Sequence, residues 1–149
     1  MQEKPPLEMR DTPEDLGFKV LKLAPSHFKE WKDYEGSDLA ALQNLFDEQE
    51  TPLKEGWTPD GLLTEVLLLE GFPLDSKTEP QPQFTENVVQ CVSSPACEHR
   101  LWTCFDATVA PATLEALALP PGDIFVCLDS ALDDNAKLRL TQAGSLKTI

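Results

Sequence analysis

The run Ile124-Phe125-Val126-Cys127-Leu128 is the feature of this sequence that most restricts its fold. It is apolar throughout, and it lies between the turn Pro120-Pro121-Gly122-Asp123 and the polar pair Asp129-Ser130, which predicts a short strand. Because successive side chains of a strand point to opposite faces, an all-apolar strand needs cover on both faces. The sequence therefore predicts a sheet with helices packed against it.

Alternating helices and strands are predicted around this run. Helix start signals stand at Ser37, at Thr58-Pro59 and at Asp133, whose side-chain oxygens can cap a first turn. The predicted helices cover residues 38–49, 59–70, 111–118 and 134–142, and a short helical turn at 27–31 is pinned by Phe28 and Trp31. The predicted strands cover 17–23, 87–92, 99–105 and 146–149, while 75–85 is an exposed loop or an edge strand.

These elements predict an α/β fold, with α+β as the alternative: a mixed β-sheet of about 4–5 strands flanked by helices. The length of 149 residues fits a single domain. Residues 1–15 are polar and contain three prolines, so we expect a flexible N-terminal tail or linker. The domain itself is expected over residues 16–149.

The chain is strongly acidic, with a net charge of −14. Binding to nucleic-acid phosphates requires clustered Lys and Arg that can release counterions, and the basic residues here are few and scattered. We therefore expect any DNA contact to be indirect. The acidity indicates a solvated surface, a basic protein partner, or mimicry of DNA charge.

No apolar run approaches the length of a membrane helix, which needs about 20 residues, and the N-terminal residues contain no secretory h-region. These features predict a cytoplasmic protein without membrane contacts. A reducing compartment disfavours a disulfide framework, and none of the four cysteines forms a C-x-x-C pair. Buried free thiols are the favoured reading, with a zinc site at Cys91, Cys97, His99 and Cys104 as the alternative.

A complete catalytic motif is not found in the sequence. There is no glycine-rich phosphate loop and no G-x-S-x-G elbow, and neither histidine is joined to a nucleophile by a motif. We expect His27 to be a surface or capping residue and His99 to belong to a hairpin strand. The pair Asp129-Ser130 follows the central strand at the edge where α/β sheets often carry ligands, but the favoured interpretation is that Asp129 or Ser130 caps or turns into the next helix.

Three segments resemble the modification (Mod) subunits of type III restriction–modification systems. They are Leu16-Gly-Phe-Lys-Val-Leu-Lys-Leu-Ala-Pro-Ser-His-Phe-Lys-Glu-Trp31, Asp60-Gly-Leu-Leu-Thr-Glu-Val-Leu-Leu-Leu-Glu-Gly-Phe-Pro-Leu74, and Gly122-Asp-Ile-Phe-Val-Cys-Leu-Asp-Ser-Ala-Leu132 together with Leu146-Lys-Thr-Ile149. The likeness covers residues 16–149. Where the family has Ser-Asn-Phe, this chain has Ser26-His27-Phe28.

The resemblance implies the C-terminal region of a site-specific adenine-N6 DNA methyltransferase. That family binds S-adenosylmethionine through an F-x-G-x-G motif and acts on a flipped adenine through D-P-P-Y, and neither motif occurs here. We therefore expect no catalytic residue, cofactor site or metal site in this chain. The implied partners are the methyltransferase core, the restriction subunit and a second Mod subunit in a homodimer.

The helix predicted at 59–70 is the candidate surface for such contacts, because its apolar residues surround most of its circumference. The candidate interface comprises Trp57, Leu62, Leu63, Val66, Leu67 and Leu69. Two other functions fit the sequence. One is a stand-alone acidic DNA mimic or regulatory protein that binds a DNA-processing enzyme. The other is a small enzyme acting at Asp129-Ser130.

Overall fold

The computed structural model describes residues 17–30, 36, 38–49 and 51–149. It contains a five-stranded mixed sheet with helices on both faces, which confirms the predicted fold class. The strands are β1 Lys77–Pro80, β2 Val89–Ser93, β3 Leu101–Cys104, β4 Ile124–Cys127 and β5 Ser145–Thr148. The helices are α1 Leu39–Gln49, α2 Pro59–Leu69, α3 Pro111–Ala116 and α4 Asp134–Ala143, with a 3-10 turn η1 at Asp129–Ala131.

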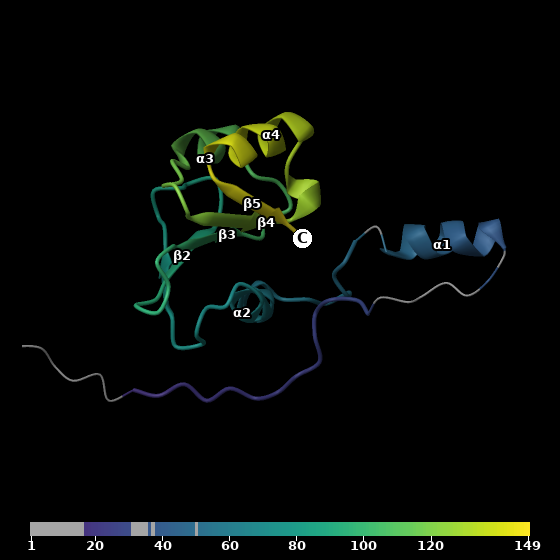
Figure 1. The fold of residues 1–149 in the computed structure, drawn as a ribbon, viewed down its shortest axis with the longest axis horizontal. Coiled ribbons are helices and arrows are strands. Elements are labelled where there is room, and N and C mark those ends of the chain that lie inside the picture. The colour runs from purple at the N-terminus through teal and green to yellow at the C-terminus, as the bar shows by residue number, and fades with distance from the viewer. Residues whose placement is uncertain (1–16, 31–35, 37, 50) are drawn as a thin grey trace, which may run out of the picture.

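The strands follow one another across the sheet in chain order, β1-β2-β3-β4-β5. The first three pair antiparallel, whereas β3, β4 and β5 run parallel to one another. Parallel neighbours need a crossover connection, and here α3 and α4 supply the two crossovers on the same face of the sheet (Figure 1). Helix α2 covers the opposite face, so the body has three layers.

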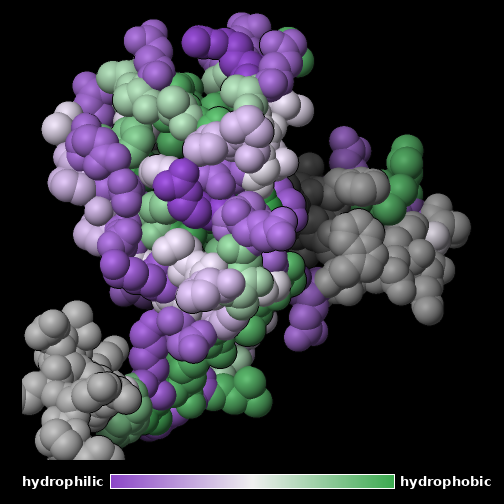
Figure 2. Space-filling model, turned by 60° about the vertical axis from the view of Figure 1, so that its left-hand side comes forward, coloured by the Kyte–Doolittle hydropathy of each residue, from purple (hydrophilic) through white to green (hydrophobic). Residues whose placement is uncertain are grey.

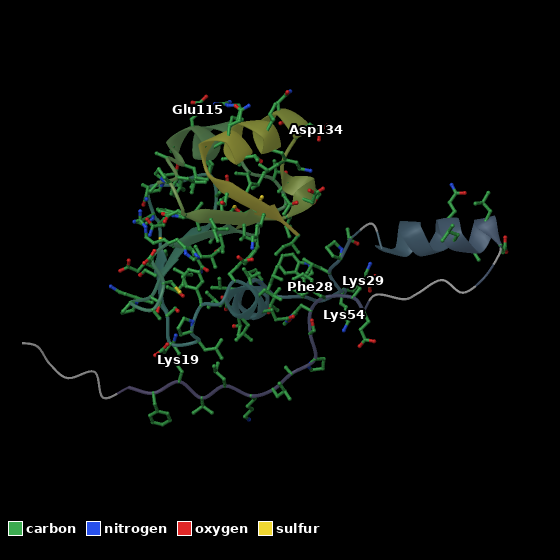
Figure 3. All side chains as sticks on the ribbon, in the orientation of Figure 1. Lys19, Phe28, Lys29, Lys54, Glu115 and Asp134 are labelled. Carbon is green, nitrogen blue, oxygen red and sulfur yellow. The ribbon has the colours of Figure 1, made fainter. Side chains whose placement is uncertain are left out.

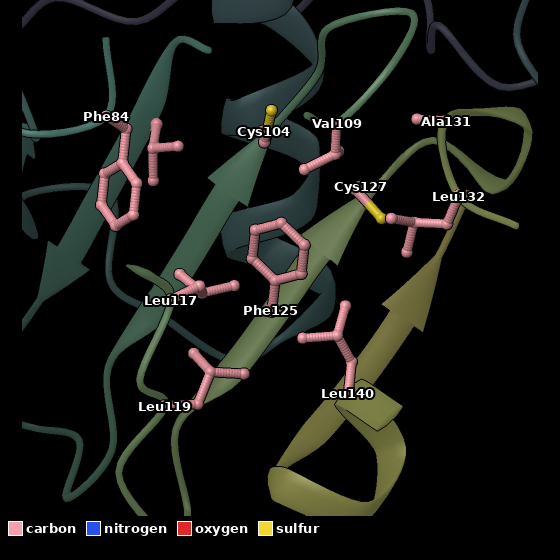
Figure 4. Packing of buried hydrophobic residues seen from close by; sticks show 11 residues of the cluster. Phe84, Cys104, Val109, Leu117, Leu119, Phe125, Cys127, Ala131, Leu132 and Leu140 are labelled. Carbon is pink, nitrogen blue, oxygen red and sulfur yellow. The ribbon is translucent and has the colours of Figure 1, made fainter. Parts of the chain in front are cut away.

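Strand β4 lies between β3 and β5 and is buried on both faces, as its sequence predicts. Phe125 and Cys127 point into the core beneath α3 and α4, where Phe125 is surrounded by apolar side chains (Figure 4). Val126 points the other way, into the core formed with α2. One five-residue apolar run thus contributes to two hydrophobic cores through the alternation of its side chains.

The predicted helix starts agree with the structure where it describes them. Thr58 caps α2, its hydroxyl accepting a hydrogen bond from the Gly61 amide at 3.3 Å. Asp133 caps α4 through the Ala136 amide at 2.7 Å. Ser37 lies outside the described residues, and at the start of α1 it is the Asp38 carboxylate that accepts from Ala40, at 3.0 Å.

Two buried side chains fix the loops at the ends of the strands. Asp123, 5% exposed, accepts hydrogen bonds from the Arg100 amide, the Arg100 guanidinium and the Trp102 indole at 2.9, 3.1 and 2.9 Å. These bonds tie the start of β4 to the start of β3. Asn87 uses both ends of its amide in the same way, donating to Asp106 and accepting from Thr113, each at 2.8 Å.

The prediction of a strand at residues 17–23 is wrong. Figure 1 shows this segment as an extended trace, but residues 18–23 belong to none of the described strands. The helical turn predicted at 27–31 is also wrong over its described residues, because Phe28 instead forms an antiparallel bridge with Leu53. Trp31 and the tail at 1–15 lie outside the described residues. His99 precedes β3 and lies in the hairpin connection rather than in a strand.

Candidate functional site

Residues 17–24 form an extended N-terminal arm whose apolar side chains face solvent. Phe18, Val20, Leu21 and Leu23 are 87%, 70%, 54% and 106% exposed. Figure 1 shows the arm crossing beneath α2, and Figure 2 shows green hydrophobic surface beside purple hydrophilic surface at the lower end of the molecule. Several large apolar side chains exposed together within one short segment make that segment a candidate interaction site.

The arm lies against the body without packing closely onto it. A hollow of about 680 Å³ separates Phe18 and Leu21 from Leu74 and Asp75. The Lys19 ammonium reaches across to the Leu74 carbonyl at 3.4 Å, a contact on the exposed surface. The four apolar side chains of the arm therefore gain little burial from their own chain.

The end of the arm, in contrast, is fastened to α2 by Glu65. One carboxylate oxygen of Glu65 accepts from the Ser26 hydroxyl at 2.6 Å. The other accepts from the His27 amide at 2.6 Å and contacts the His27 Nδ1 at 2.5 Å. We call these three residues the Glu65 clasp. Because an ionised carboxylate can only accept, Nδ1 carries the proton in this contact.

The Glu65 clasp requires a gap in the surface of α2, which Gly61 provides. A Cβ atom at Gly61 would lie 2.3 Å from Cε1 of the His27 ring, closer than any side chain tolerates. Burial raises the pKa of Glu65, but the bonds from Ser26 and His27 outweigh it, and the pKa lies below its ordinary value. No local sequence signal predicts this contact, since His27 and Glu65 are 38 positions apart.

Beyond the clasp, residues 27–29 pair with residues 52–54. The Lys29 amide donates to the Pro52 carbonyl at 2.7 Å and the Lys54 amide to the His27 carbonyl at 2.8 Å. Figure 3 shows Phe28, Lys29 and Lys54 gathered at this crossing, with Lys19 further along the arm. Phe28 packs against the core on the α2 face and anchors this segment to the body. The spacing of Phe28 and Trp31 predicted such an anchor within a helical turn, whereas Phe28 lies in a β-bridge and Trp31 lies outside the described residues.

A groove of about 310 Å³ lies between α2 and β5. Phe28, Val66, Leu69, Val126 and Ile149 form its apolar walls. At its rim the Lys147 ammonium contacts the Glu70 carboxylate at 2.5 Å, joining β5 to the end of α2. The groove belongs to the same side of the molecule as the clasp, because Phe28 lines it.

The candidate interface on α2 divides into a buried part and an exposed part. Leu62, Leu63, Val66 and Leu67 are at most 8% exposed and pack into the core, so they cannot present a surface to a partner. Leu69 is 70% exposed and its neighbour Leu68 58%. Trp57 is half-buried beside the same core. When apolar residues surround most of a helix, the sequence alone does not show which of them pack against the sheet and which face solvent.

The pair Asp129-Ser130 forms the 3-10 turn that leads away from β4, which agrees with the structural explanation of its sequence. The Asp129 amide donates to the Ile149 carbonyl at 2.7 Å, and its carboxylate contacts the Lys137 ammonium at 2.8 Å. Hydrogen bonds from Lys137 and Thr148 lower the pKa of Asp129. These contacts connect the turn to α4 and β5, and they leave the carboxylate paired rather than poised as a base.

The four residues of the candidate zinc site do not converge. Cys97 packs against the core on the α2 face, whereas Cys104 belongs to the core on the opposite face. The described residues contain no group of three or more His, Cys, Asp or Glu that could hold a metal ion. All four cysteines are free thiols, but the prediction that they are buried holds only for Cys91, Cys104 and Cys127, since Cys97 is half-buried. Burial raises the pKa of Cys127 to about 12.

Comparison with protein-family models, with curated proteins and with solved structures finds no match for this chain. In the part of the chain that the structure describes, no helix has both the length and the apolar character to cross a membrane. The defining combination of the candidate site is an exposed apolar arm whose base is held firmly by the Glu65 clasp.

Proposed function

We propose that this chain is the non-catalytic C-terminal assembly domain of a type III restriction–modification DNA methyltransferase. In this role it supports adenine methylation through contacts with the methyltransferase core, a second Mod subunit or the restriction subunit, in the cytoplasm. S-adenosylmethionine and the target adenine belong to the core, which carries the motifs that this sequence lacks. The chain itself contributes binding surface and no catalytic group.

The observation that supports this proposal best is the exposure of Phe18, Val20, Leu21 and Leu23 on an anchored arm. Removing an apolar side chain of this size from water contributes roughly 1.5–3 kcal/mol when burial is complete. A partner that covered the arm would gain this contribution several times over. The Glu65 clasp holds the base of the arm, so less conformational entropy is lost when a partner binds.

The resemblance in the segments 16–31, 60–74 and 122–132 supplies the identity of the partner, and the arm lies within the first of them. The acidic charge of −14 agrees with a domain that meets proteins rather than the DNA backbone. At least eight of the described acids accept hydrogen bonds or ion pairs within the chain itself: Asp38, Glu65, Glu70, Glu79, Asp106, Asp123, Asp129 and Asp133. Local pairing of this kind gives the DNA-mimic alternative no specific support.

Co-purification with a methyltransferase core tests the proposal. The core should carry F-x-G-x-G and D-P-P-Y motifs of a type III system and end before the segment that resembles residues 16–31. We expect one complex in size-exclusion chromatography and a gain in methyl transfer from labelled S-adenosylmethionine to DNA. Absence of both a complex and a gain in methylation would overturn the proposed function.

A further inference from the structure

The arm has the alternating apolar sequence of a β-strand and an extended backbone, but it belongs to no sheet among the described residues. Phe18 and Val20 fall on one side of the extended backbone, and Leu21 and Leu23 on the other. A strand that is apolar on both sides fits a sheet whose two faces are both covered. Residues 18–24 pair with none of the described strands, so their sheet must come from elsewhere.

The edges of the chain's own sheet are poor acceptors for this strand. The β1 edge carries Lys77 and Pro80, and proline provides no amide for pairing. The β5 edge is four residues long and carries Lys147. Short edge strands, lysines and prolines are the devices with which natural proteins prevent edge-to-edge pairing. A net charge of −14 also makes two copies of the chain repel each other.

The charge of the arm indicates what its acceptor looks like. Residues 17–24 contain two lysines, Lys19 and Lys22, and no acid, in a chain with 26 acidic residues. A complementary surface therefore carries carboxylates beside the receiving edge, which assist encounter and fix the register. Strand addition to an exposed sheet edge is an established mode of protein recognition, with main-chain bonds supplying affinity and side-chain pockets supplying specificity.

We infer that residues 17–24 add as a β-strand to the open, carboxylate-flanked sheet edge of a different protein. This inference rests on the proposed function, under which that protein is the methyltransferase core. The Glu65 clasp then marks where the added strand ends and the chain turns into the body of this domain. Leu68 and Leu69, exposed on α2, lie outside the strand and are not required for it.

Hydrogen–deuterium exchange provides the test, with the methyltransferase core defined above as the probe. In the chain alone, the amides of residues 18–24 should exchange at the rate of an open coil, and sedimentation should give a monomer. In the complex we expect at least about tenfold slower exchange at alternate positions of the arm, since half of the amides of an edge strand still face solvent. Protection of the arm in the chain alone, at any concentration, would overturn the inference.

Proline substitutions distinguish strand pairing from contact by side chains alone. Val20→Pro and Leu21→Pro both retain apolar character, but successive amides point to opposite sides of a strand, so only one of the two faces the partner. We expect one variant to weaken the complex at least about tenfold and the other to weaken it much less. Equal binding by both variants would count against strand addition.

Charge and apolar variants complete the experiment. Leu21→Asp and the double reversal Lys19→Glu with Lys22→Glu should each weaken the complex about tenfold or more. Leu138→Asp is the matched control, because Leu138 is 59% exposed on α4, away from the arm. If the core binds and methylates while all arm variants bind like wild type, the inference fails and the proposed function stands. If the core does not bind at all, both fail.

Discussion

The body of the molecule, residues 51–149, and the arm use the same types of apolar residue with opposite results. Leu62 in α2 is fully buried, whereas Leu23 in the arm is as exposed as in an isolated peptide. The body places its apolar residues on elements that face one another across a sheet, and the arm has no such neighbour. An apolar pattern therefore indicates that a segment favours burial, but whether its side chains are buried depends on which other elements of the chain pack against it.

The two regions meet at a polar junction rather than an apolar one. The Glu65 clasp and the pairing of residues 27–29 with 52–54 are hydrogen bonds, and Phe28 is the apolar anchor among them. Such a junction can hold the base of the arm without burying its apolar residues. Variants on the two sides of this junction should therefore have very different effects.

The largest expected difference is between two phenylalanines. Phe125→Ala empties the centre of the core beneath α3 and α4 and should lower the free energy of unfolding by about 3–5 kcal/mol. Phe18→Ala removes a side chain that is 87% exposed and should change it by less than about 0.5 kcal/mol. Urea denaturation followed by tryptophan fluorescence measures both. Comparable losses would mean that the arm is part of the core.

A smaller loss is expected for Asp123→Ala, which leaves the Arg100 amide and the Trp102 indole without their buried acceptor. Hydrogen bonds to a charged group contribute about 1.5–3 kcal/mol, and we expect a loss in this range. The same denaturation experiment gives the value. Asp123→Asn is the matched variant, since it keeps an acceptor and should recover part of the stability.

Glu65→Gln should increase amide exchange near the Glu65 clasp more than it lowers the free energy of unfolding of the whole domain. It weakens the bonds to Ser26 and His27, so the Lys29 amide should exchange faster while the amides of β4 are unchanged. The folded pKa of Glu65 lies below its ordinary value of 4.5, so the contribution of the ionised clasp is complete above that pH. It is lost as the pH falls through the folded pKa, and the wild type should then exchange like Glu65→Gln.

The smallest effect is expected for Asp129→Ala. The Asp129 carboxylate is 60% exposed, and its pairing with Lys137 is screened by water and salt. The variant should unfold at nearly the wild-type urea concentration and, under the proposed function, bind the methyltransferase core unchanged. Loss of an activity of the isolated chain in this variant would instead support the small-enzyme reading of Asp129-Ser130.

Much of the body could be predicted because its signals are local. The all-apolar run at 124–128 correctly predicted β4, and the capping residues Thr58 and Asp133 correctly predicted where α2 and α4 begin. The hairpin of β2 and β3 followed from two apolar runs around a turn. In each case the residues that decide the structure lie within a few positions of one another.

The candidate site could not be predicted in the same way because it depends on distant parts of the chain. The strand predicted at residues 17–23 was wrong, because apolar alternation indicates only propensity and a strand also needs a paired neighbour. The contact of His27 with Glu65 and Gly61 joins segments more than 30 residues apart. Apolar residues surround most of α2, so its sequence did not indicate which side packs on the sheet. In the structure Leu62 and Val66 face the sheet, and Leu68 and Leu69 face solvent.

The order of the strands has a consequence for how the chain folds. Since β1 to β5 are neighbours in both sequence and space, each strand can pair as soon as the next one emerges, and no early strand waits for a late partner. Low sequence separation between contacting elements favours fast folding and short exposure of apolar intermediates. The arm precedes all five strands and takes no part in their pairing. The proposed association of the arm with a partner would therefore not compete with folding of the body.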